Sequence, residues 1–266
     1  MDAEARDLRK ALGLYTAGKR VQAAAIFARH DSLEAKVGRE VTAWPDGTVA
    51  GLSRLAALYP KSSLVQLELG LSVFWAGEPG ATAAWRQAAV LEPDTAYAVT
   101  AGNLLYPQYA RNLPTFVPAE RPPASLDGKS PPVQLAILER NATSGSIGAR
   151  LIYGVALQKL GHPLSARREF DAAARQAPAD PEALVASAVG RFDKADPAAA
   201  FSKLGPLARR FPNSATVRFH LGLLLLWIGS VDQAKKELRL GTTAQPGSPL
   251  AREAARYLTT LRHVGR

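Results

Sequence analysis

The chain has 266 residues, of which 47% are hydrophobic, so it is long enough for one or two domains with a sizeable buried core. This composition excludes a disordered tail, and the absence of cysteine excludes disulfides, zinc–thiolate sites, iron–sulfur clusters and thiol nucleophiles. The formal charge is +10, and residues 148–266, with 18 basic and 9 acidic side chains, account for +9 of it.

The N-terminal segment MDAEARDLRK is charged and has no apolar run of the kind found in a secretory signal. The most apolar stretch, Leu221 to Ile228, is far shorter than the roughly 20 residues that a membrane-spanning helix needs. We therefore expect a soluble, cytoplasmic protein with no transmembrane segment.

The first part of the chain, residues 1–106, shows degenerate helical repeats. Two helix hairpins are expected at about 4–30 and 33–60, and a third ends at Pro93. In the third, Gly70, Ala81 and Trp85 have the spacing of residues that face one another across two packed helices. Residues 95–106 are expected to form one more helix.

Residues 107–131 form a Pro-rich insertion that separates this helix from the next one, expected at 132–142. Residues 107–132 hold seven of the 19 prolines, which predicts an extended segment without helix. The apolar residues Leu113, Phe116 and Val117 favour an ordered intramolecular strap that folds back onto the helices, although a flexible linker remains the alternative.

The C-terminal repeats, residues 132–247, contain three periods of 34 residues. A small residue recurs at Gly154, Ala188 and Gly222, and a proline recurs at the end of each period, at 178, 212 and 246. Helical spacing predicts a first helix at 149–160 that ends at Gly161, followed by a second helix that packs antiparallel to it. A single hairpin cannot bury its apolar face alone, so the hairpins must stack. Residues 248–266 are expected to provide a capping helix.

The pattern small-x6-Gly-x4-Ala-x3-Phe-x2-Ala-x4-Pro resembles the tetratricopeptide repeat (TPR), and residues 148–246 match it almost column by column. The family's first-helix tryptophan is absent, since Arg150, Leu184 and Arg218 stand in its column. The resemblance implies an all-α, right-handed α-solenoid of about seven hairpins, forming a single domain over residues 1–266.

No catalytic motif is recognisable. The segment GSIGAR at 145–150 lacks the lysine and spacing of a phosphate-binding loop, and the four histidines fit no metal-ligand spacing. We expect no enzyme activity, no metal and no cofactor.

The resemblance also implies a concave groove lined by the first helices. Four columns of the repeat face such a groove, and here they are mostly aliphatic or aromatic, unlike the polar columns with which the family's carboxylate-clamp members bind acidic C-terminal tails. The expected partner-binding residues are Leu67, Leu71, Phe74, Trp75, Leu151, Val155, Val185, Val189, Phe192, Phe219, Leu223, Leu226 and Trp227.

Two interpretations of function follow from these features. The first is a non-catalytic scaffold or adaptor that binds a peptide or helix of a protein partner in the apolar groove. The alternative is an adaptor whose basic C-terminal outer surface binds nucleic acid or an anionic membrane. That surface is expected on the second helices, which carry Arg167, Arg168, Arg209, Arg210, Lys235 and Lys236.

Overall fold

The computed structural model describes residues 3–263, and all the regular secondary structure in this part of the chain is helical, with no β-strand. It forms two compact units, Met1–Leu105 (unit 1) and Tyr106–Arg266 (unit 2). No helix among the described residues is long and apolar enough to cross a membrane. The predicted all-α, TPR-like arrangement of helix hairpins is confirmed, while the handedness of a superhelix stays a prediction.

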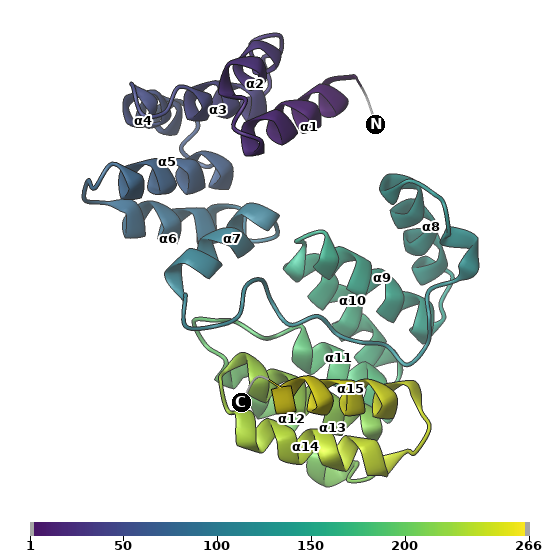
Figure 1. Cartoon of the computed structure of the whole chain (residues 1–266). Coiled ribbons are helices and arrows are strands. Elements are labelled where there is room, and N and C mark those ends of the chain that lie inside the picture. The colour runs from purple at the N-terminus through teal and green to yellow at the C-terminus, as the bar shows by residue number, and fades with distance from the viewer. Residues whose placement is uncertain (1–2, 264–266) are drawn as a thin grey trace. The chain divides into compact units, whose positions relative to one another are not determined.

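Unit 1 is a series of antiparallel hairpins in which each helix packs on the next along the chain, as Figure 1 shows. The first helix of one hairpin also contacts the first helix of the following hairpin, so α1, α3, α5 and α7 form one side of the unit. The helices are α1 (Ala3–Thr16), α2 (Arg20–Phe27), α3 (Leu33–Thr42), α4 (Thr48–Leu58), α5 (Ser63–Trp75), α6 (Ala81–Leu91) and α7 (Ala96–Leu105).

Unit 2 begins with a segment that has no α-helix, residues 106–130, interrupted only by the short 3-10 turn η1 (Ala124–Leu126). The helices that follow again pair in sequence, and α11 contacts both α9 and α13. They are α8 (Pro131–Thr143), α9 (Ile147–Lys159), α10 (Pro163–Gln176), α11 (Pro181–Val189), α12 (Ala198–Arg210), α13 (Ala215–Trp227), α14 (Val231–Ala244) and α15 (Pro249–His263).

The two expected halves of the interrupted repeat fold as helices in different units. Helix α7 packs on α5 and α6 in unit 1, whereas α8 packs on α9 in unit 2. Helix α15 lies where a capping helix was expected and packs on α13 and α14, although its role as a cap stays a prediction and residues 264–266 lie outside the described part.

The small residue in the first helix allows close packing of each hairpin. A Cβ atom added at Gly154 in α9 would lie 2.4 Å from Cε1 of Phe170 in α10, which is closer than real Cβ contacts come. Gly161 has the left-handed conformation (φ 81°) that the turn after α9 requires, as the sequence predicted. Helices α10, α12 and α14 each end two residues before a repeat proline, because proline cannot continue the helical hydrogen bonding.

Ion pairs hold the helices of unit 2 together. Arg150 of α9 pairs with Glu169 of α10 at 2.7 Å, and the residues two periods later, Arg218 and Glu237, pair at 2.9 Å. Two of the three residues in the column that lacks the family's tryptophan therefore join the helices of their own hairpin by charge.

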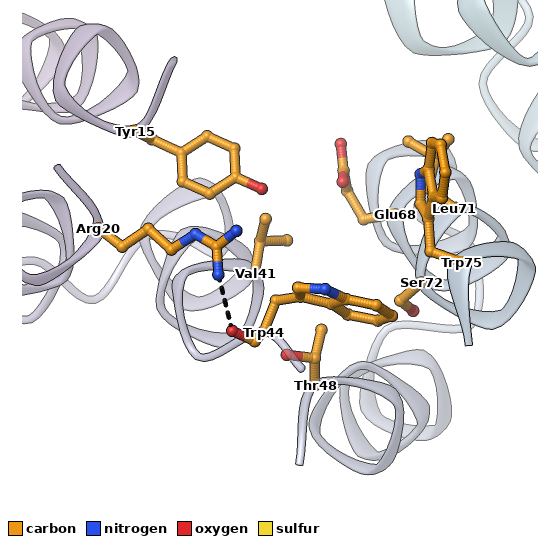
Figure 2. Close-up of a pocket in the computed structure, with 9 residues that line it drawn as sticks. All are labelled: Tyr15, Arg20, Val41, Trp44, Thr48, Glu68, Leu71, Ser72 and Trp75. Carbon is orange, nitrogen blue, oxygen red and sulfur yellow. Dashed lines mark hydrogen bonds between the residues drawn. The ribbon is translucent and has the colours of Figure 1, made fainter. Parts of the chain in front are cut away.

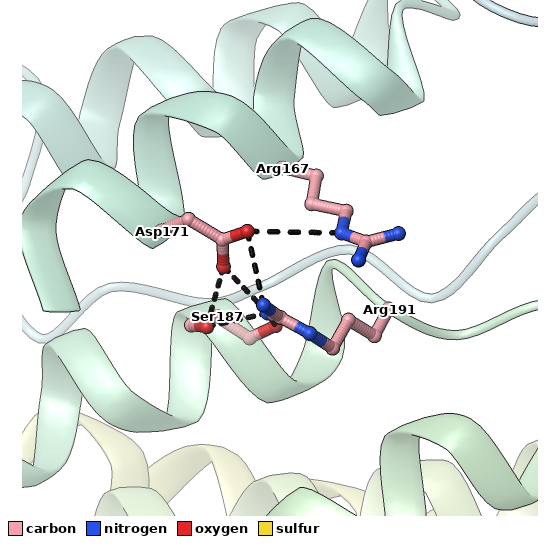
Figure 3. Close-up of polar contacts among 4 residues, drawn as sticks. All are labelled: Arg167, Asp171, Ser187 and Arg191. Carbon is pink, nitrogen blue, oxygen red and sulfur yellow. Dashed lines mark hydrogen bonds and ion pairs between the residues drawn. The ribbon is translucent and has the colours of Figure 1, made fainter. Parts of the chain in front are cut away.

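A second polar cluster joins α10 to α11 (Figure 3). The carboxylate of Asp171 accepts hydrogen bonds from both terminal nitrogens of Arg191 and from the hydroxyl of Ser187, the latter at 2.6 Å. Arg167, one turn before Asp171 on α10, approaches the same carboxylate at 3.7 Å. Asp171, Ser187 and Arg191 are only partly exposed, whereas Arg167 is exposed, so the bonds among the first three align consecutive repeats with partial shielding from water.

Candidate functional site

The Pro-rich segment of unit 2 lies against the first helices of that unit. We name residues 110–119 the strap (Figure 1). Phe116 is only 1% exposed, and its ring lies 4.8 Å from that of His220 and 5.6 Å from that of Phe170, measured between centroids. Leu113 packs against the same apolar cluster as Phe116, and Val117 packs against a neighbouring cluster. The three apolar residues named from the sequence are therefore all in contact with the helices.

Polar side chains hold the backbone of the strap. Gln158 of α9 accepts a hydrogen bond from the N–H of Phe116 (3.0 Å) and donates one to the carbonyl of Pro114 (3.3 Å). The ammonium of Lys194 donates to the carbonyl of Ala110 at 2.7 Å. Gln158 thus forms hydrogen bonds with both an N–H and a C=O group of the extended strap, as the backbone of a neighbouring β-strand would. These backbone groups of the strap are therefore satisfied.

Two further residues bind the strap from α11 and α13. Glu182 accepts from the N–H of Ala119 at 2.6 Å, and Nε2 of His220 accepts from the N–H of Val117 at 3.0 Å. The other ring nitrogen of His220 lies 2.7 Å from the carbonyl of Thr216, an arrangement that requires the neutral imidazole with its proton on Nδ1. Burial lowers the pKa of His220 to about 4, so the ring stays neutral at physiological pH.

Most of the residues expected to line a groove in unit 2 are not accessible to a partner. Of the residues expected to bind a partner there, only Leu226 and Trp227 are partly exposed. The others are buried, some of them directly beneath the strap, and cannot contact a partner in this conformation: Leu151, Val155, Val185, Val189, Phe192, Phe219 and Leu223.

The corresponding surface of unit 1 is open. On α5, Leu67 is buried and Leu71 is half-buried, but Phe74 is 54% exposed and Trp75 is 72% exposed. The ring of Phe74 contacts both Trp75 (5.5 Å) and Trp85 (5.7 Å between centroids), so the buried indole of Trp85 supports Phe74, which in turn contacts Trp75. Supported aromatic side chains present a preformed apolar surface at little cost in conformational entropy.

A pocket of about 440 Å³ lies next to these aromatics, within the range typical of ligand sites. It is formed where the ends of α1 and α3, the starts of α2 and α4 and the C-terminal half of α5 come together, as Figure 2 shows. The residues that line it are Tyr15, Arg20, Val41, Trp44, Thr48, Glu68, Leu71, Ser72 and Trp75.

Two charged side chains enter this pocket. Arg20 donates to the carbonyl of Trp44 at 3.0 Å, and the carboxylate of Glu68 points into the space between Tyr15 and Trp75 (Figure 2). Glu68 forms no hydrogen bond or ion pair with any residue of the described part of the chain, and burial raises its pKa above the usual value. The pocket therefore combines aromatic walls with an incompletely compensated carboxylate.

Sequence reasoning missed most of these polar residues. Gln158 lies in a groove column whose other members are Phe74, Phe192 and Leu226, and this polar interruption is the signal that could have identified it. Tyr15, Trp44 and Glu68 come from three degenerate repeats, and nothing in their spacing indicated a common pocket. Within residues 3–263, no group of three or more His, Asp or Glu side chains is placed to hold a metal ion.

Comparisons with known proteins show a likeness to solved structures alone. No family model matches the chain, and no curated protein matches it. Several solved structures are similar, and the three that follow have TM-scores below 0.5. Human IFIT1, solved as a dimer with PPP-AAAA, is 15% identical with a TM-score of 0.39, and the match covers 100% of this chain and 65% of that one.

A tetratricopeptide repeat protein from Parabacteroides merdae is 14% identical with a TM-score of 0.38, over 96% of this chain and 98% of that one. Yeast Tom70 is 13% identical with a TM-score of 0.34, over 92% of this chain and 63% of that one. The chain thus spans less than two thirds of human IFIT1 and of Tom70. Likenesses at these identities and scores carry no conclusion about what this chain binds.

Proposed function

We propose that this TPR-like chain is a non-catalytic protein-interaction scaffold, and that unit 1 binds a peptide or helix of a protein partner across the exposed face of α5. The observation that carries the proposal is the contrast between the two units. Trp75 and Phe74 project into solvent beside a pocket, whereas the equivalent face of unit 2 is covered by the strap.

Exposed aromatic pairs favour this function on energetic grounds. Trp and Tyr are enriched among the residues that dominate binding energies, and exposed apolar patches beside a concavity are typical of interaction sites. Binding would remove Phe74 and Trp75 from water without any rearrangement of α5, because Trp85 already supports the ring of Phe74 and Phe74 contacts Trp75. The apolar surface that the partner contacts is therefore already formed in the free chain.

The strap explains why unit 2 does not need a partner to cover its apolar face. Phe116, Leu113 and Val117 occupy positions that a bound peptide would otherwise fill. Under this proposal the strap covers the apolar face of unit 2. The binding surface, which the sequence predicted along both halves of the chain, is then confined to α5 and the adjoining pocket.

The competing proposal assigns binding to basic side chains on α10, α12 and α14, with nucleic acid or an anionic membrane as the target. The two proposals differ in their response to salt, because counterion-driven binding weakens steeply with ionic strength and burial of apolar side chains does not.

Affinity capture from nuclease-treated extract of the source cells, at low and high salt, tests the proposal. Trp75→Ala is compared with Leu58→Ala, which removes another side chain that is 72% exposed in the same unit but lies on α4 away from the pocket. The proposal expects a salt-resistant partner that Trp75→Ala loses and Leu58→Ala retains. A partner that both variants retain, or that high salt releases, would contradict it.

A further inference from the structure

The pocket beside α5 has features that a purely apolar peptide-binding surface does not need. Glu68 lies in the middle of α5, seven residues before Trp75, and its carboxylate faces the pocket in which Tyr15 and Trp44 provide aromatic walls (Figure 2). The carboxylate of Glu68 is partly shielded from water and has no partner among the described residues, so the site favours a ligand that supplies the missing positive charge.

The other charged group of the pocket does not supply it. Arg20 lies beyond ion-pair distance of Glu68, and one of its terminal nitrogens is engaged by the carbonyl of Trp44. Among the described residues that line the pocket, there is no other cationic side chain. The carboxylate is therefore left for a cation that comes from outside the chain.

Resting on the function proposed above, we propose that the pocket receives a lysine or arginine side chain of the bound peptide, with its cationic head at Glu68. Its aliphatic stem lies against the rings of Tyr15, Trp44 and Trp75. A cation over an aromatic face gains up to about 2 kcal/mol when water is removed, and the nearby carboxylate adds a charge-assisted hydrogen bond. The partner segment thus has a basic residue next to the apolar residues that cover Phe74 and Trp75.

The volume and shape of the pocket agree with this ligand. About 440 Å³ accommodates one long side chain, and the three aromatic rings match its methylene stem better than they match a carboxylate. An acidic side chain would meet Glu68, and a small neutral one would leave the carboxylate without a partner.

The test follows the indole N–H resonances of the chain's four tryptophans by NMR during titration with N-acetyl-lysinamide, and in parallel with N-acetyl-norleucinamide, which has a similar shape without the charge. We expect saturable shifts of Trp44 and Trp75 with the lysine compound alone. Trp85, which is buried, and Trp227, which lies in unit 2, serve as internal references.

Two substitutions separate charge from shape. Glu68→Gln keeps the size of the side chain and is expected to weaken binding of N-acetyl-lysinamide about tenfold or more, which corresponds to about 1.4 kcal/mol. Arg20→Gln removes the cationic side chain found among the described residues of the pocket, so binding of the lysine compound should stay equal or become tighter. Unchanged Trp44 and Trp75 resonances in the free Glu68→Gln variant verify that the pocket is intact.

Equal shifts with the norleucine compound, or undiminished binding to Glu68→Gln, would overturn this inference. Its failure is distinguishable from that of the proposed function. If Trp75→Ala loses the captured partner while N-acetyl-lysinamide causes no shifts, the proposed binding surface on α5 is supported and only the proposal of a basic ligand is wrong. If the partner survives Trp75→Ala, the proposed function fails whatever the lysine titration shows.

Discussion

Removal of the Phe116 ring should destabilise unit 2 far more than its position in a proline-rich loop suggests. The side chain is 1% exposed and touches two other rings, and its own N–H is bonded to Gln158. Truncating a fully buried Phe to Ala costs about 3–5 kcal/mol, because transfer free energy is lost and a cavity remains. We expect Phe116→Ala to lower the free energy of unfolding of unit 2 by that amount. Val133→Ala, at a side chain 47% exposed on α8, should change it by no more than about 0.5 kcal/mol.

Hydrogen exchange followed by mass spectrometry on the intact chain measures this effect locally. Peptides from α9, α11 and α13 report the opening free energy of the helices beneath the strap, and peptides from unit 1 provide the reference. Faster exchange under the strap in Phe116→Ala, with Val133→Ala like the wild type, is the expected result. If Phe116→Ala costs less than about 1 kcal/mol in α9, α11 and α13, the strap is not an integral part of the unit and the reasoning is refuted.

Three further predictions concern charged or titratable groups. The pKa of His220 is about 4 in the folded chain against 6.5 in a free histidine, so only the unfolded state takes up a proton between these values. The free energy of unfolding should therefore fall by about 3 kcal/mol from pH 6.5 to 4, and a urea-unfolding series that shows the same slope for His220→Gln would contradict this. Burial raises the pKa of Glu68, so Glu68→Gln should raise the midpoint of thermal unfolding of unit 1 at pH 7, where the carboxylate is ionised. That gain should vanish in acid, where both side chains are neutral, and a lower midpoint at pH 7 would disprove the expectation. Asp171→Ala leaves Arg191 without its carboxylate and should cost about 1–3 kcal/mol, and a double-mutant cycle with Arg191→Ala tests whether the two side chains are coupled by at least 0.5 kcal/mol.

The hairpins were predictable because their determinants are local and periodic. A small residue such as Gly154, a turn glycine such as Gly161 and a proline such as Pro178 each impose a specific backbone or packing requirement, and the 34-residue period repeats these requirements. The positions of helix ends in unit 2 follow from them directly. The division into two units was not apparent from the sequence. Helices α7 and α8 have ordinary helical patterns, and neither sequence indicates which neighbouring helix it packs on.

The candidate site was less predictable, since it depends on contacts between distant segments. The resemblance to the tetratricopeptide repeat implied that Phe74 and Trp75 face a groove, and the apolar character of Phe116 suggested an ordered strap. Periodicity gave no means to see that Gln158 and His220 bind the backbone of that strap, because any polar side chain in a first helix is equally compatible with solvent. Glu68 escaped notice for the same reason, since only the fold surrounds it with rings from other repeats.

Hydroxyl-radical footprinting of the chain with and without its captured partner would test most directly the claim that unit 1 binds while unit 2 is sealed by its own strap. The account predicts that the partner protects Phe74 and Trp75 and leaves the reactivity of Phe116 and Trp227 unchanged. Protection at Trp227, or a rise in the reactivity of Phe116 as the strap is displaced, would instead place the binding surface on unit 2 and contradict the account.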